Sequence, residues 1–383
     1  MCSSDAEPER TSLRELATLF LKLGTIAFGG PAAHVAMMRR EVVERLGWLD
    51  ERRFLDLLAA ANVIPGPTST ELAIHIGYER GRLPGLIVAG VAFIVPAMLI
   101  TGLCGWLYVT YGTLPDVRGV LYGVAPVVVA IVADALRGLL PRAASSWPLR
   151  GLGVVALTAL WAGLDELTVL FGCGALAALV AGARGAGRAP AVLLLPTTML
   201  PSIAAAATPV SASGLFFVFT KIGSVLFGSG YVLLAFLRAE LVERLGWLTE
   251  TQLVDAVAVG QVTPGPVFTT ATFLGFVLGG TTGALASTVG IFLPAFVFVA
   301  LLGPLVPRLR RRPMFAALLD GVTVASLALM AAVTLELARS TVVDATTVGV
   351  LLAAWIVLTS SRIGPTWLIV GGAAIGWLLH DPR

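Results

Sequence analysis

The sequence predicts an all-α, polytopic transmembrane protein built from two repeats of inverted topology, and three observations support this fold class. The chain of 383 residues is 57% hydrophobic and only 13% charged, whereas a soluble domain carries about 25% charged residues. Apolar runs such as Leu83–Val109 and Phe315–Leu335 reach the length of about 20 residues that crosses a bilayer. The third observation is a sequence pattern that occurs twice at a fixed offset.

The duplication is clearest in the heptapeptide Val-Glu-Arg-Leu-Gly-Trp-Leu, which occurs at Val43–Leu49 and at Val242–Leu248. Each copy is followed by Pro-Gly-Pro, and the offset between the copies is 199 residues (242 − 43). We therefore divide the chain into a tail (1–12), a first transmembrane repeat (13–190), a kinked connecting segment (191–212) and a second repeat (213–383). The same offset pairs Lys22 with Lys221, Arg39 with Arg238, Glu41 with Glu240, and Asp56 with Asp255.

Composition argues against several other classes of protein. The polar residues 1–14 contain no apolar stretch with a cleavage site, so they are expected to form a cytoplasmic tail, not a signal peptide. Three scattered cysteines and three histidines without a His-x-x-x-His pair predict no disulfide framework, no metal site and no cofactor. The net charge of +3 arises from loop residues, so we expect no nucleic-acid partner and a lipid bilayer around the chain.

Loop charges predict that the two halves have opposite orientations. Arg308–Arg312 follows the long span of the second half, whereas Arg80 and Arg82 precede the corresponding span of the first half. Basic loops remain on the cytoplasmic side of the membrane. The halves are therefore inverted, and the kinked segment Ala191–Thr208 supplies the odd crossing between them. This orientation places the N-terminus in the cytoplasm.

Two short segments of each half are predicted to be re-entrant hairpins. The basic stretch Arg39–Arg53 lies between other cytoplasmic loops, which requires 13–46 and 51–78 to enter and leave the membrane on one side. Their tips are glycine and proline clusters. Non-helical backbone at membrane depth is tolerated only inside protein or along a cavity, so the tips should face an internal pocket.

The hairpin tips offer the chemistry of an anion site. A helix that begins with proline in its first turn, as expected at Pro31, Pro67 and Pro266, has free N–H groups and a positive dipole end. Glycine lets the backbone approach a ligand, and hydroxyls of the first turn add donors. The alternative is that these residues merely form tight turns. The candidate binding residues are Gly29, Gly30, Pro31, Pro65, Gly66, Pro67, Thr68, Ser69 and Thr70, with Gly228, Ser229, Gly230, Pro264, Gly265, Pro266 and Thr269 in the second half.

Four side chains near the tips extend this candidate site. Asn62 and Gln261 occupy matching positions three residues before Pro-Gly-Pro, where an amide can donate to an oxyanion or satisfy local carbonyls. Lys22 and Lys221 lie within apolar segments, seven residues before a glycine tip. An intramembrane lysine indicates function, although it can also extend to the interface.

His34 and Glu71 follow the two tips of the first half and have apolar or hydroxyl counterparts, Leu233 and Thr270. Either residue could titrate and couple proton movement to transport. The alternative is a hydrogen-bonded histidine and a glutamate that caps a helix end.

The chain resembles the chromate ion transporter family in its long, two-domain form. The resemblance is carried by Phe28-Gly29-Gly30-Pro31, by Val43–Leu49, by the segment Asn62–Glu71 and by Gly77-Tyr78, with echoes in the second half. It implies an inner-membrane protein that exports chromate and confers chromate resistance. The second half departs from the pattern, because Gly-Gly-Pro becomes Gly-Ser-Gly and Asn becomes Gln. We therefore expect the principal contacts in the first half.

These observations together predict a secondary transporter, not an enzyme, that binds a tetrahedral dianion between its repeats. Membrane potential, proton exchange or both would drive export, since no nucleotide-binding motif is present. A sulfate-like substrate or a passive anion channel on the same scaffold is the alternative; an intramembrane lipid enzyme would need a catalytic constellation that the chain lacks. The sequence leaves a homodimer open.

Overall fold

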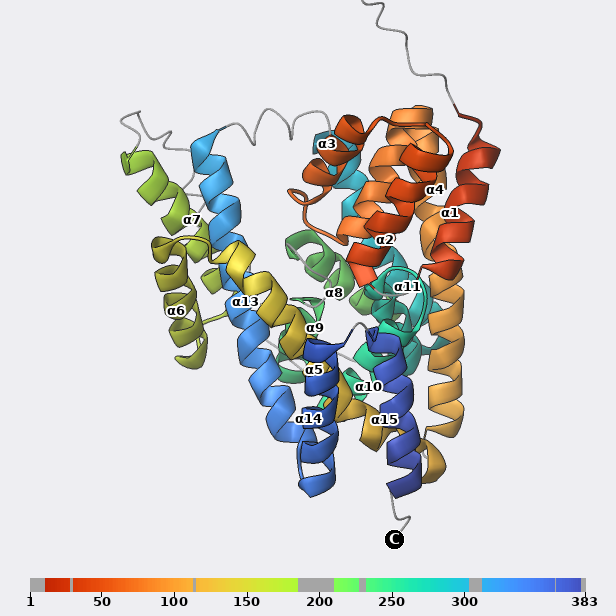
Figure 1. The fold of residues 1–383 in the computed structure, drawn as a ribbon, viewed down its shortest axis with the longest axis vertical. Coiled ribbons are helices and arrows are strands. Elements are labelled where there is room, and N and C mark those ends of the chain that lie inside the picture. Colours follow the sequence, from red (N-terminus) through yellow and green to blue (C-terminus); the bar gives the residue numbers. More distant parts are fainter. Residues whose placement is uncertain are drawn as a thin grey trace, which may run out of the picture.

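The computed structural model describes residues 11–27, 30–112, 115–184, 210–226, 232–302, 312–361 and 363–379, and every regular element within these ranges is helical (Figure 1). Five of the described helices are long and apolar enough to cross a membrane. The chain is a multi-pass membrane protein. The first half contains α1 (Leu13–Ile26), α2 (Gly30–Arg39), the π-helical turn η1 (Arg40–Arg45), α3 (Glu51–Ala61), α4 (Thr68–Tyr111), α5 (Pro115–Ala143), α6 (Trp147–Trp161) and α7 (Glu166–Arg184).

The second half follows the same order of elements. It contains α8 (Ala212–Val225), α9 (Val232–Leu237), the π-helical turn η4 (Arg238–Arg244), α10 (Glu250–Val262), the short 3-10 helix η5 (Val267–Thr269), α11 (Thr270–Leu302), α13 (Pro313–Thr341), α14 (Ala345–Ser360) and α15 (Pro365–Leu379). The predicted connecting segment 191–208 lies outside the described residues.

The repeated heptapeptide forms the same helix end in both halves. In each copy a π-helical turn stops at a glycine with positive φ, Gly47 at 59° and Gly246 at 61°. Glycine adopts this left-handed conformation without the steric cost that a Cβ would add. The next helix then begins at a polar cap: Asp50 accepts a hydrogen bond from the N–H of Arg53, and Thr249 forms a capping box with Gln252. The heptapeptide therefore sets the angle between the helices on either side of it.

The helix after each Pro-Gly-Pro is kinked, at Arg82 in α4 and at Gly279 and Gly280 in α11. Arg82 in α4 has φ 54° and ψ −147°, and Gly280 in α11 has φ 62° and ψ −151°. These kinks are 198 residues apart (280 − 82), one fewer than the offset between the Pro-Gly-Pro segments. The second half has lost a residue between these two points, where the 3-10 turn η5 replaces the first α-helical turn seen in α4. Each kink separates the short helix from the long span that the sequence predicts.

The two halves share their helix packing instead of forming separate bodies. α5 of the first half packs against α14 and α15 of the second, and α13 of the second packs against α6 and α7 of the first (Figure 1). Small residues permit these crossings: a Cβ on Gly123 would lie 2.1 Å from the carbonyl oxygen of Gly372, and one on Gly321 would lie 2.6 Å from that of Cys173. Lipid tails are as apolar as leucine, so close packing stabilises such helix pairs more than burial from water does.

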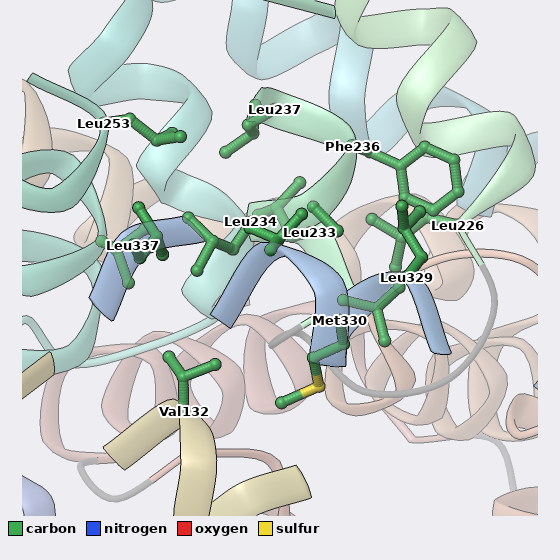
Figure 2. Close-up of a cluster of buried hydrophobic side chains, with 14 of the residues drawn as sticks. Val132, Leu226, Leu233, Leu234, Phe236, Leu237, Leu253, Leu329, Met330 and Leu337 are labelled. Atoms are coloured by element: carbon green, nitrogen blue, oxygen red, sulfur yellow. The ribbon is translucent and has the colours of Figure 1, made fainter. Parts of the chain in front are cut away.

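The short helix α9 is buried on every side by apolar residues. Figure 2 shows Leu233 and Leu234 of α9 beside Leu329 and Met330 of α13, with Val132 of α5 nearby. All six residues of α9 are at most 4% exposed. This packing fixes α9 against α5 of the first half and α13 of the second.

Candidate functional site

The two Pro-Gly-Pro segments meet the ends of helices from the opposite half. The N–H of Gly66 donates to the carbonyl oxygen of Leu226 at 2.8 Å, and the N–H of Gly265 donates to that of Ala27 at 2.9 Å. These two hydrogen bonds are the same contact made twice, since both residues of one pair are offset by 199 from those of the other. The tip of 51–78 and the tip of 250–278 therefore each lie against the opposite half, at the junction of the two halves. The structure brings Pro65, Gly66, Pro67, Pro264, Gly265 and Pro266 to this junction.

The other two predicted tips are only partly described. Gly29, Gly228, Ser229 and Gly230 lie outside the described residues, whereas Gly30 and Pro31 are the first two residues of α2. Pro67 and Pro266 differ slightly from the prediction. Each is the cap residue before the first helical turn, with extended ψ values of 103° and 128°, and is not inside that turn. A cap leaves the first N–H groups of the helix equally free.

The first turn of α4 presents donors that have no protein acceptor. The N–H groups of Thr68, Ser69 and Thr70 form no hydrogen bond within the described residues, as expected for a helix start. Ser69 is 3% and Thr70 0% exposed, and the hydroxyl of Thr70 lacks a partner among those same residues. Buried donors at the positive end of a long helix are suited to an anion.

Glu71 completes this turn and is fully buried. Its side chain is 0% exposed, and neither carboxyl oxygen has a hydrogen-bond partner in the described part of the chain. The carboxyl group lies against the tip, because a Cβ added to Gly66 would come within 2.6 Å of Oε1. Gly66 has φ 139°, which glycine adopts far more readily than other residues.

The matching turn of the second half has no free hydroxyl. Thr269 donates to the carbonyl oxygen of Pro266 at 2.8 Å, and Thr270 donates to that of Val267 at 2.7 Å. Gln261 is buried and lines a cavity of about 10 Å³ beside Thr270. Asn62, its counterpart, is exposed and donates to the carbonyl oxygen of Leu58 at 2.9 Å. The two halves thus differ in the donors that their tips leave free.

Both predicted lysines form ion pairs. Lys22 contacts Glu41 at 2.7 Å, and Lys221 contacts Glu240. Each glutamate also binds an arginine of the heptapeptide, 2.5 Å from Arg45 in the first half. Desolvation works against ionised Glu41, but the hydrogen bonds from Lys22 and Arg45 lower its pKa. Lys22 and Lys221 lie five residues before Ala27 and Leu226, the carbonyl acceptors at the junction, or roughly 7 Å along the helix axis.

His34 contacts the same backbone carbonyl as the second-half tip. Its Nε2 lies 3.0 Å from the carbonyl oxygen of Ala27, the same oxygen that Gly265 contacts. A carbonyl only accepts, so Nε2 carries the proton and Nδ1 is left as an acceptor. Nδ1 is buried and has no partner among the described residues. Burial lowers the pKa of His34 to about 4, against the opposing effect of the hydrogen bond to Ala27, so the ring is neutral near pH 7.

Sequence reasoning missed two groups. The first is His75, which lies one helical turn beyond Glu71 and is 5% exposed, with Nε2 unpartnered within the described residues. Its spacing of four residues from Glu71, which places both on one face of a helix, could have indicated it.

The second is a cavity of about 600 Å³ between the ends of α4 and α13 and the starts of α5 and α10. Its lining includes Arg118, Tyr108 and Asp255, and Tyr108 donates to Asp255 at 2.7 Å.

The chain is similar to known transport proteins over nearly its whole length. A family model described as chromate transporter matches residues 14–183 and 213–377. A chromate transport protein of Cupriavidus metallidurans is 33% identical over 96% of this chain and 94% of its own length. A probable chromate transport protein of Synechococcus elongatus is 33% identical over 96% and 95%, and a chromate transport protein of Pseudomonas aeruginosa is 31% identical over 98% and 95%. No solved structure matches the chain.

Proposed function

This chain belongs to the chromate transporter family, and we propose that it exports chromate from the cytoplasm through a site at the junction of the Pro-Gly-Pro tips. The family consists of transporters, so the protein is a membrane transporter and not an enzyme. The observation that carries the site is the first turn of α4. Its three free N–H groups and the buried, unpartnered hydroxyl of Thr70 form a donor set for a tetrahedral oxyanion.

The proposed contacts lie mainly in the first half. Glycine at the tips keeps the backbone open to a ligand, while Thr269 contributes only backbone because its hydroxyl is occupied. Gln261 contributes an amide from the second half. Lys22 and Lys221 add positive electrostatic potential from a distance, and their glutamate partners partly cancel this potential. Chromate bound here would also replace the contacts that Gly66 and Gly265 now make across the junction.

We further propose that the halves are inverted repeats with the N-terminus in the cytoplasm of a bacterial-type inner membrane. Support comes from the reciprocal hydrogen bonds of Gly66 and Gly265. It also comes from reciprocal helix packing: α5 packs against α14 and α15 of the second half, and its counterpart α13 packs against α6 and α7 of the first. The basic loops of the two halves lie on opposite ends of corresponding spans. A site between such repeats is open to one side of the membrane at a time.

Membrane potential suffices to drive export of an anion. An inside-negative potential of 100 mV favours exit by about 2.3 kcal/mol per charge, so a dianion gains twice that. Proton exchange, for example through His34, would add to this drive. A passive anion channel on the same scaffold would use the same potential, but its flux would not saturate at low chromate.

Transport in reconstituted vesicles tests the proposal. Chromate flux should saturate, respond to the sign of an imposed potential, and be reduced by sulfate or molybdate if the site takes tetrahedral dianions in general. Phosphate, which is tetrahedral but keeps a proton near neutral pH, serves as a further competitor. Flux of sulfate that exceeds chromate flux would move the assignment to a sulfate-like substrate. Folded protein that carries no chromate in either direction would refute the proposal.

A further inference from the structure

We propose that Glu71 binds one proton together with the oxyanion, so that proton and anion cross the membrane in the same direction. This inference rests on the proposed function of the α4 tip. It concerns one carboxyl group, buried against Gly66 within the turn that supplies the free N–H donors. Both oxygens of that carboxyl lack a partner among the described residues.

No cation of the neighbouring helices forms an ion pair with Glu71 in the described part of the chain, and Arg14 of α1 and Arg52 of α3 are exposed. α1 and α3 pack against α4; the lysine of α1, Lys22, pairs with Glu41, and Arg53 of α3 pairs with Glu79 at 2.8 Å. η5 and α11 pack against α4 as well, and their sequence contains no Asp, Glu, Lys, Arg or His.

Three further acidic or histidine side chains of α4 and of the helices packed on it are buried, whereas Asp56 of α3 and Glu79 of α4 are exposed or half-buried. His34 of α2 is held by the carbonyl of Ala27. Asp255 of α10 is held by the hydroxyl of Tyr108. His75 lies four residues after Glu71 on α4 itself. No described ion pair therefore neutralises an ionised Glu71, and burying a charge without a partner is costly.

An ionised Glu71 and a bound dianion would repel each other strongly, because the repulsion between like charges grows as their distance and the dielectric constant around them decrease. A proton on the carboxyl removes this repulsion. It also converts the group from an acceptor into an O–H donor for an anion oxygen. The bound complex thus holds one anion and one proton.

The coupling between the two ligands fixes the direction of proton movement. If a proton on Glu71 raises the affinity for the anion, the anion must raise the affinity for the proton by the same factor. Exchange would require the opposite, that each ligand excludes the other. Glu71 therefore supports joint movement, and the unit that crosses carries one negative charge where chromate alone carries two.

The second half adds no further proton at its tip. The residues at the 198- and 199-residue offsets from Glu71 are Thr269 and Thr270, and both hydroxyls already donate to backbone carbonyl oxygens. The number of protons bound at the tips is accordingly one for each anion.

Chromate binding to the purified transporter, measured from neutral to alkaline pH where chromate is the dianion, tests the inference. In the wild type, affinity should fall by up to about tenfold per pH unit once Glu71 ionises, with proton uptake per chromate rising towards one. Glu71→Gln, which mimics the protonated carboxyl, should bind chromate with an affinity independent of pH. Asp255→Asn, which removes another buried carboxyl, should keep the wild-type slope.

A second measurement uses wild-type protein in vesicles with a pH-sensitive dye, so it does not depend on the folding of a variant. Protons should move with chromate, one for one. Movement of protons against chromate, a flat affinity in the wild type, or an unchanged slope in Glu71→Gln would overturn the inference and leave the proposed function intact. Absence of chromate binding at every pH would overturn both.

Discussion

The carboxyl group of Glu71 packs against Gly66 at a separation that leaves no room for a Cβ, which would lie 2.6 Å from Oε1. Gly66 also has φ 139° and donates its N–H across the junction to Leu226. A single glycine thus joins the proposed proton group to the contact between the two halves.

Gly66→Ala should therefore impair both stability and transport. Backbone strain and the clash with Glu71 predict a loss of about 1–3 kcal/mol in the free energy of unfolding, together with reduced chromate flux. Thermal unfolding in detergent and vesicle flux measure the two effects. Gly47→Ala is the control, because Gly47 has φ 59° but its added Cβ would meet nothing within 4 Å. It should lose stability without losing flux; equal flux losses in the two variants would argue against a role for the Gly66–Glu71 contact.

The hydroxyl of Thr70 is expected to contact the anion. Thr70→Val keeps the side-chain shape and removes the donor, so the Kd for chromate should rise about tenfold, or ~1.4 kcal/mol. Thr269→Val removes a hydroxyl that is occupied by Pro266 and should leave the Kd within about twofold of wild type. Equilibrium binding compares the two variants. If both weaken chromate binding to the same extent, the hydroxyl of Thr70 does not contact the anion.

Asp255 gives stability a pH dependence. Burial raises its pKa from the ordinary 3.8 to about 6, against the hydrogen bond from Tyr108, which lowers it. The folded state thus holds the proton more tightly than the unfolded chain, so stability falls as pH rises from about 4 to 6 and is constant above. The loss is on the order of a few kcal/mol. Asp255→Asn should remove the dependence in that window, as followed by thermal unfolding; an undiminished slope would show that another group titrates.

Lys22 should contribute little to binding through direct contact. The Lys22 side chain is 49% exposed although Glu41 is only 14% exposed, and ion pairs with an exposed partner stabilise by about 0–1 kcal/mol. Lys22→Met should raise the Kd for chromate by less than about threefold. The charge exchange Lys22→Glu with Glu41→Lys should restore only part of any loss of stability seen in Lys22→Glu alone, because the introduced lysine would face Arg45. A Kd increase of a hundredfold in Lys22→Met would instead place the ammonium group on the anion.

The sequence predicted the features that depend on local patterns. The spans follow from apolar length, and the Pro-Gly-Pro tips follow from the residues that end one helix and begin another. The pairing of Lys22 with Glu41 was within reach, because both residues recur together at the 199-residue offset. The packing of α5 with α14 and α15 was not, since partners far apart in the chain are chosen by shape.

The difference between the two tips also depended on geometry. A threonine in a first turn can donate to a ligand or to its own backbone, and Thr70 and Thr269 make opposite choices. The one-residue shift at η5, which brings about the second choice, shows only in the backbone. The cavity beside Arg118 and Asp255 likewise combines residues from several helices, so no stretch of sequence indicates it.

The position of bound chromate tests the central claim most directly. Chromium scatters anomalously, so a crystal of the protein grown with chromate would place the ion without reference to any variant. We predict a chromium peak within hydrogen-bond reach of the N–H groups of Thr68–Thr70, beside Glu71 and the Pro-Gly-Pro tips. A chromium peak confined to the cavity beside Arg118, with the first turn of α4 empty, would contradict the assignment.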